Sequence, residues 1–220
     1  MRLVFIALLL AAAPAGDITF TAQSVNVEQP GTPVKITILR WSTDDETRPI
    51  VTALAAPPQQ PSDASRGLPA EAARGRAAAA AGRGAAGRGR GRGPAAAPLS
   101  PIAAFTAALN RVPTVGYLWT NDITGYSIKY AWHSALPDGT ERIVLVSDRR
   151  LGAYTIAWKS KTAETDYSFT LIELRTGPKG LIEGKTSLAS KVVVDSEAKT
   201  VALENYAGAS ANLAPVRKRQ

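Results

Sequence analysis

The sequence predicts a mainly β fold: an antiparallel sandwich or barrel of about eight or nine strands, with one helix or helical pair packed on it. Short runs that alternate apolar and polar residues fill the chain from residue 115 onward, and turns containing glycine or proline separate them at close spacing. Helical spacing of apolar residues is confined to two stretches before residue 115. The 220 residues include no cysteine, so a packed core must stabilise this fold without disulfides.

Residues 1–15 are interpreted as a secretory signal peptide. Arg2 precedes an apolar run that ends in small residues, Ala-Pro-Ala, and this run is shorter than the ~20 residues that span a bilayer. No later segment is apolar enough to do so. We therefore expect an exported protein, in the periplasm or outside the cell, with no transmembrane segment.

Two strands are expected next, over residues 18–22 and 34–40, because apolar and polar residues alternate there and Pro30-Gly31 between them is a turn signal. A helix follows, since Thr43 with Glu46 three residues later fits a capping box. Pro49 is disfavoured inside a helix, so we expect this helix to be kinked or to start late.

Residues 57–98 form a low-complexity insertion that divides a single β-rich domain into residues 16–56 and 99–220. The insertion holds 14 Ala, 8 Gly, 7 Arg and 6 Pro, and its one large apolar side chain is Leu68. Such a segment cannot bury enough surface to offset its chain entropy, which predicts disorder. Helical patterns flank it, so we interpret it as a lengthened connection between two helices, which costs little because closure entropy grows slowly with length.

The second helix is expected to begin after Ser100, a good N-cap, with Pro101 at its first position and Pro113 as its stop. Strands account for the rest of the chain, with turns at 137–139 and 177–180. The expected strands are VGYLWT, GYSIKYAWH, ERIVLVSD, YSFTLIELRT, LIEGKTSLASKVVVD, TVALENYA and a short run over residues 213–216.

The net charge of +8 lies mainly outside the expected folded part. Residues 57–98 contribute +5, a basic tail at 217–219 contributes +3, and Arg2 is lost with the signal peptide, which leaves a net charge of −1 for the folded part. This distribution argues against nucleic acid as a partner. The Arg-rich insertion also lacks the aromatic residues that stack on bases. It is either an inert spacer or a weak contact to an anionic surface such as lipid or polysaccharide.

Motifs for catalysis are absent from the sequence: it has no nucleophile elbow, phosphate-binding loop or zinc-protease motif. A single histidine, His133, and no cysteine predict no metal site, and no cofactor is expected. Two carboxylates meeting in a cleft remain a candidate catalytic pair, with Glu173 and Asp148 the residues of interest, although surface charges paired across strands are the favoured explanation. Glu173 follows apolar residues on one face, so we expect it to be buried with a partner such as Arg175 or an opposing arginine.

Aromatic residues cluster between 117 and 132, and Trp119, Tyr130 and Trp132 are the candidate ligand-binding residues. If they line the mouth of a barrel, they can bind a hydrophobic or carbohydrate ligand; the alternative is that they pack in the core or at a sheet edge. Strict alternation places Tyr126, Ile128, Tyr130 and Trp132 on one face of their strand.

Several segments, in order, resemble a family of small exported bacterial proteins of unknown function. They are RWSTDDE, GYSIKYAW, DGTERIVLVSDR, FTLIELR and LENYA. The resemblance implies a signal peptide and one compact domain, and it brings no activity, cofactor or catalytic residue with it. The insertion at 57–98 and Pro49 depart from that family's pattern, which has a short charged helical segment at this place.

These observations favour a non-catalytic protein of the cell envelope that binds a small molecule or an envelope partner through its β domain. Two alternatives stay open, a glycosidase-like hydrolase that uses paired carboxylates and a structural surface protein. The absence of catalytic motifs makes an enzyme the less favoured interpretation.

Overall fold

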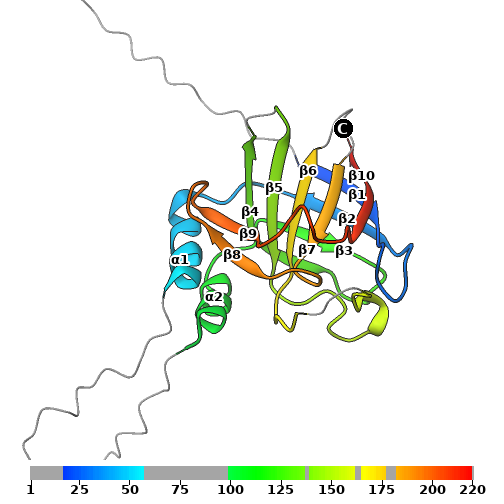
Figure 1. The fold of residues 1–220 in the computed structure, drawn as a ribbon, viewed down its shortest axis with the longest axis horizontal. Helices are drawn as coiled ribbons and strands as arrows, with labels where there is room; N and C mark the ends of the chain where they lie inside the picture. Colours follow the sequence, from blue (N-terminus) through cyan, green and yellow to red (C-terminus); the bar gives the residue numbers. More distant parts are fainter. Residues whose placement is uncertain (1–16, 57–98, 137–138, 162–164, 177–181, 220) are drawn as a thin grey trace, which may run out of the picture.

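The computed structural model describes residues 17–56, 99–136, 139–161, 165–176 and 182–219. Eight antiparallel strands form a closed barrel (Figure 1). The barrel strands are β1 (Ile18–Gln23), β2 (Pro33–Ile38), β3 (Gly116–Trp119), β4 (Tyr126–Ala135), β5 (Glu141–Ser147), β6 (Leu171–Thr176), β7 (Ile182–Thr186) and β10 (Leu213–Arg219). The remaining elements are the helices α1 (Asp44–Ala55) and α2 (Pro101–Leu109), the short 3-10 helix η1 (Ile156–Trp158) and a hairpin of β8 (Val192–Asp195) and β9 (Thr200–Leu203).

The barrel order is β1-β10-β7-β6-β5-β4-β3-β2, so most neighbouring strands in the barrel are also neighbours in the sequence. The exceptions are β7 and β10, which the β8–β9 hairpin separates in the sequence, and β1 and β10, which close the barrel. The predicted mainly β, antiparallel fold with a helical pair is confirmed, and of the two architectures left open, sandwich or barrel, the structure has the barrel. Ten strands are present in the described residues because LIEGKTSLASKVVVD forms two strands, β7 and β8.

A packed core fills the barrel. It includes Phe20, Ile36, Leu118, Leu145 and Leu213, and no buried member of this cluster exposes more than 7% of its surface. An eight-stranded barrel is just wide enough for its inward side chains to fill it. The described interior is therefore a hydrophobic core with no water-filled lumen among these side chains.

A second hydrophobic core lies outside the barrel, against β4, β5 and β6. The helices and the β8–β9 hairpin cover this side, while β10, β1 and β2 lie on the opposite side (Figure 1). The outer core contains Ile50, Phe105, Leu109, Tyr130, Val144, Phe169, Leu171 and Leu203. β5 and β6 are consequently buried on both faces, which explains the apolar run IVLV of β5; in β6 the buried stretch LIEL includes the charged Glu173.

A β-bulge in β4 corrects the expected alternation of its aromatic residues. Tyr126 and Ile128 face the barrel core, whereas Tyr130 and Trp132 belong to the outer core. The β4–β5 register shifts between Ile128 and Tyr130. The prediction that these four residues lie on one face of the strand is wrong, because the extra residue of the bulge inverts the inside–outside alternation for the residues that follow it.

Both helices start at the caps predicted from the sequence. Thr43 and Glu46 form the reciprocal capping box of α1, and the Ser100 hydroxyl accepts a hydrogen bond from Ala103 N at the start of α2. The expected late start of α1 is wrong, since it begins at Asp44 and continues through Pro49. The capping box and the burial of the helix against the outer core offset the hydrogen bond that proline cannot make.

The basic residues at 217–219 lie in β10, which pairs with β1 and closes the barrel. The expectation of a basic tail outside the folded part is therefore wrong. The cause is that Arg217, Lys218 and Arg219 are three consecutive charged residues, so this part of the strand lacks the apolar–polar alternation by which strands are recognised.

Several expectations fall outside the described residues. They are the signal peptide at 1–15, the insertion at 57–98 and most of the turns at 137–139 and 177–180. Among the described residues, none of the helices has the length and apolar character needed to cross a membrane.

Candidate functional site

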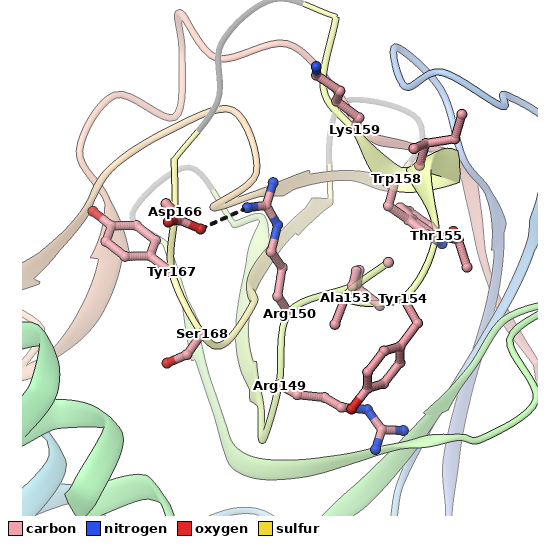
Figure 2. A pocket seen from close by; sticks show the side chains of 13 residues that line it. Arg149, Arg150, Ala153, Tyr154, Thr155, Trp158, Lys159, Asp166, Tyr167 and Ser168 are labelled. Atoms are coloured by element: carbon pink, nitrogen blue, oxygen red, sulfur yellow. Dashed lines mark hydrogen bonds and ion pairs between the residues drawn. The ribbon is translucent and has the colours of Figure 1, made fainter.

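A hollow of about 620 Å³ lies beside the long connection between β5 and β6 (Figure 2). Its volume falls in the range of small-molecule sites. Two segments line it, residues 149–159 and 166–168. In Figure 2, Arg150 lies between the segment that carries Asp166, Tyr167 and Ser168 and the turn that carries Tyr154 and Trp158.

The base of this hollow is anchored in the barrel core. Leu151 and Trp158 are 1% and 2% exposed and belong to the core cluster, so they close this end of the barrel. Gly152 between them has a φ of +70°, and a Cβ there would lie 2.7 Å from the Trp158 Cβ. Only glycine therefore fits, since it accepts the left-handed conformation and the close approach of the indole.

Hydrogen bonds fix the same turn from the neighbouring strands. The Leu151 amide donates to Thr170 Oγ1 over 2.8 Å, and the Gly152 amide donates to the Tyr126 hydroxyl over 3.1 Å. The Tyr126 hydroxyl donates in turn to Asp122. Burial and this hydrogen bond to Asp122 raise the pKa of Tyr126 to about 12, so the hydroxyl stays protonated as a structural group.

Three cationic side chains line the hollow: Arg149, Arg150 and Lys159. The Arg149 guanidinium donates to Thr124 Oγ1 over 2.9 Å and lies over the Tyr126 ring, 4.6 Å from its centroid, which fixes its position. Arg150 pairs with Asp166 at 3.3 Å, but this carboxylate is fully exposed. An ion pair with so exposed a carboxylate contributes little to stability.

Apolar side chains of the hollow are unusually exposed. Tyr154 is 87% exposed and Ile156 is 72% exposed, in a turn that Leu151 and Trp158 at its two ends anchor in the core. Across the hollow, the Tyr167 ring stacks on Phe169 with centroids 5.1 Å apart, which fixes that wall to the outer core. The hollow thus combines positive charge with exposed apolar area on an ordered base.

Trp119, Tyr130 and Trp132 do not share a pocket. Trp119 is 49% exposed on the outer side of β3. Tyr130 is fully buried under the outer layer, where its hydroxyl lies 2.6 Å from Thr200 Oγ1, and Trp132 packs against the same outer core. All three side chains lie on the outer side of the barrel, but Tyr130 and Trp132 are covered by the outer layer and Trp119 is not, so no barrel mouth brings them together.

Glu173 is completely buried, and arginines satisfy it, as the sequence predicts. Its Oε1 accepts two hydrogen bonds from Arg175, at 2.6 and 2.9 Å. The same oxygen lies 2.9 Å from Arg142 Nε, and these two groups form an ion pair that lacks the geometry of a hydrogen bond. Its Oε2 accepts the Leu203 amide of β9 at 3.1 Å. Arg142 also pairs with Asp195 at 2.7 Å. The cluster fastens the β8–β9 hairpin to the barrel.

Asp148 has a separate local role. Its Oδ1 accepts the Ser127 amide at 3.1 Å, and its own amide donates to the Ser127 carbonyl, which continues the β4–β5 pairing. His133 is half exposed, with its ring 4.1 Å from the Trp41 ring and its Nδ1 3.7 Å from Glu141. Among the described residues, no group of three or more histidine, aspartate and glutamate side chains is placed to hold a metal ion.

The residues of the hollow were not singled out by the sequence analysis. The signal available was the unassigned segment DRRLGAYTIAWKS, residues 148–160, which joins two strands and holds adjacent arginines, a glycine and several aromatic residues. Ordered loops of this length are commonly functional.

The sequence matches no family model and no curated protein, and the fold matches no solved structure.

Proposed function

We propose that this is an exported, non-catalytic binding protein of the cell envelope that takes an anionic ligand with an apolar part in the hollow beside the β5–β6 connection. The observation that carries the proposal is the pairing of cationic and exposed apolar side chains on a base anchored in the barrel core. Export rests on the sequence of residues 1–15, and the resemblance to small exported bacterial proteins is consistent with it.

Charge supports the choice of an anion. Arg149, Arg150 and Lys159 line the hollow, and Asp166 is the only carboxylate among the described residues that line it. Lys159 is exposed and makes no ion pair with any described residue. Its ammonium and the Arg150 guanidinium are the groups that a ligand carboxylate, sulfate or phosphate would contact.

The exposed apolar side chains of the hollow support a ligand that has an apolar part as well as a negative charge. Tyr154 and Ile156 expose most of their side chains at the rim, and covering an apolar side chain on binding is favourable by roughly 25 cal/mol per Å². An aromatic or aliphatic anion satisfies both kinds of contact.

Binding is favoured over carboxylate-dependent hydrolysis because the candidate carboxylates are engaged elsewhere. Both oxygens of Glu173 contact arginines or a backbone amide beneath the β8–β9 hairpin, and Asp148 holds the Ser127 amide. A glycosidase needs two carboxylates facing the scissile bond across one cleft.

The proposal is tested by fluorescence titration of the full chain with 8-anilinonaphthalene-1-sulfonate, an aromatic sulfonate. Arg150→Gln removes a cation and Tyr154→Ser removes exposed ring area, so each is expected to weaken binding about 3- to 10-fold. Arg48→Gln is the matched control, because Arg48 is an exposed arginine of α1 on another surface, and it should leave the affinity unchanged.

An uncharged dye, Nile red, separates the two contributions. Its binding should weaken with Tyr154→Ser and stay unchanged with Arg150→Gln. Equal sulfonate affinity in wild type, Arg150→Gln and Tyr154→Ser would overturn the proposal, as would an equal loss in Arg48→Gln.

A further inference from the structure

The uncovered side of the barrel carries an ordered array of polar and aromatic side chains. The outward-facing residues of β10, β1, β2 and β3 are called the open face here. They form two rows across the strands, Arg219, Thr19, Thr37 and Tyr117 in one row and Arg217, Thr21, Lys35 and Trp119 in the next. Residues directly opposite in antiparallel strands lie about 5 Å apart, so each row is a continuous line of side chains.

Positive charge on the open face is unopposed. The two rows contain three cations, Lys35, Arg217 and Arg219, and no carboxylate. All three are exposed, and none makes an ion pair with a described residue. Asp17, an exposed acid, lies one residue before β1 and outside both rows.

Two aromatic rings lie at the β3 edge of the open face. Trp119 is 49% exposed and Tyr117 is 41% exposed, and alternate residues of one strand stand about 7 Å apart on the same side. A Cβ on Gly125 would lie 2.9 Å from the Trp119 ring, so the indole packs directly on the Gly125 backbone. That contact orients the indole before any ligand arrives.

Hydroxyl groups and a shallow hollow complete the open face. Thr19, Thr21 and Thr37 occupy its centre, between the arginines of β10 and the rings of β3. A hollow of about 370 Å³ continues the second row, lined by Thr21, Gln23, Pro33, Pro215 and Arg217, with Ala22.

We propose that the open face binds an anionic polysaccharide. Sugar rings lie on Trp119 and Tyr117, the threonine hydroxyls contact sugar hydroxyls, and Lys35, Arg217 and Arg219 bind carboxylate or sulfate groups. The four strands span three inter-strand spacings, about 14 Å, which accommodates a short stretch of the polymer.

Nucleic acid fits this face less well. A phosphate backbone needs a continuous cationic track beside its stacked bases, whereas two of the three cations here gather at the β10 edge and the centre presents hydroxyls. The open face lies on other strands than the hollow at the β5–β6 connection, so this proposal and the preceding one can fail independently.

Fluorescence anisotropy with fluorescein-labelled alginate, a polymer of uronic acids, tests the proposal on the full chain. Trp119→Ala is expected to weaken binding about tenfold through the loss of stacking, and Trp119→Phe to keep the affinity within about threefold. Arg217→Gln with Arg219→Gln is also expected to weaken binding about tenfold at low salt.

Arg48→Gln with Arg111→Gln is the matched control, because it removes the same charge from exposed arginines outside the open face. The seven arginines of residues 57–98 are the same in every variant, so they add a constant background. Far-UV circular dichroism checks that each variant is folded, and unlabelled dextran, a neutral polysaccharide, should not compete.

The proposal is overturned if Trp119→Ala binds alginate as wild type does, or if the control pair weakens binding as much as the Arg217 and Arg219 pair. Tighter binding of oligo(dT), or of vesicles containing anionic phospholipid, with loss in the same variants would assign the open face to nucleic acid or membrane instead.

Discussion

At the scale of single residues, several charged side chains of this protein form ion pairs that link one secondary-structure element to another. Arg40 and Glu46 are an example, because Arg40 Nη2 lies 2.7 Å from Glu46 Oε1 while Glu46 Oε2 accepts the Thr43 amide at 2.9 Å. The hydrogen bond from Arg40, together with that from Thr43, lowers the pKa of Glu46 to about 2. This carboxylate links the end of β2 to the start of α1.

The lowered pKa of Glu46 predicts a defined pH dependence of stability. An unfolded glutamate titrates near pH 4.5, so the ionised Glu46 stabilises the fold above that pH, and its contribution is lost as the pH falls from 4.5 to about 2. Glu46→Gln should lower the free energy of unfolding by about 1–2 kcal/mol at pH 7, an amount reduced by the exposure of Arg40.

Urea denaturation of wild type and Glu46→Gln between pH 7 and pH 2 measures this contribution. The difference between the two proteins should shrink below pH 4.5. Asp45→Asn is the control, since Asp45 is 91% exposed and its pair with Arg48 is long, at 3.4 Å. A difference between wild type and Glu46→Gln that stays constant down to pH 2 would rule out the proposed role of the carboxylate.

At the scale of elements, the β8–β9 hairpin depends on a buried charge cluster as well as on apolar packing. Glu173 of β6 accepts the Leu203 amide of β9, and Arg142 of β5 reaches Asp195 at the end of β8. The amide of Ala198 and the Arg142 guanidinium both lower the pKa of Asp195. The hairpin in turn covers Val144 and Leu171 of the outer core.

Removal of the Glu173 charge is expected to loosen this hairpin. Glu173→Gln should lower the free energy of unfolding by about 2–4 kcal/mol, because it leaves Arg142 buried with only one remaining partner. Chemical denaturation measures the loss, and hydrogen exchange at the Leu203 amide should become faster. Glu183→Gln is the matched control on the exposed side of β7, opposite Arg175, and should change stability by less than about 0.5 kcal/mol.

Elements were predictable from the sequence where local chemistry determines them. The caps at Thr43 and Ser100 and the turn at Pro30-Gly31 depend on neighbouring residues, and the structure has them as expected. The bulge between Ile128 and Tyr130 depends on tertiary packing, because the residues before it face the barrel core and those after it face the outer core. The alternation of apolar and polar residues along the strand does not reveal it.

The candidate site was less predictable than the fold. The hollow depends on Trp158 entering the barrel core beneath Gly152, and a tertiary contact of this kind leaves no periodic pattern in the sequence. The burial of Glu173 with an arginine partner was predicted, because a charge among apolar residues on one strand face requires a counter-ion.

At the scale of the whole molecule, the barrel is built from both sides of the 57–98 insertion. β2 precedes the insertion and pairs with β3, which follows it, and α1 packs against α2. Contacts among the described residues of the barrel and its helical layer therefore hold the two flanking segments together.

Replacement of residues 57–98 by about twelve glycine and serine residues is expected to leave the protein folded. The shorter connection lowers the entropic cost of closure, so the free energy of unfolding should rise by about 1 kcal/mol. Circular dichroism and urea denaturation test this, with the full chain as reference. Loss of cooperative unfolding would show that the insertion contributes to the core.

Closure of the barrel joins the two most distant parts of the described chain. Thr19 of β1 lies opposite Arg219 of β10, two hundred positions later in the sequence. Contacts of such long sequence separation form slowly, because the intervening chain must be ordered first. Until they form, the sheet is open and β1 presents an unpaired edge that can add a strand from another copy of the chain. The rate of this last pairing thus sets how long the newly made protein is exposed to aggregation.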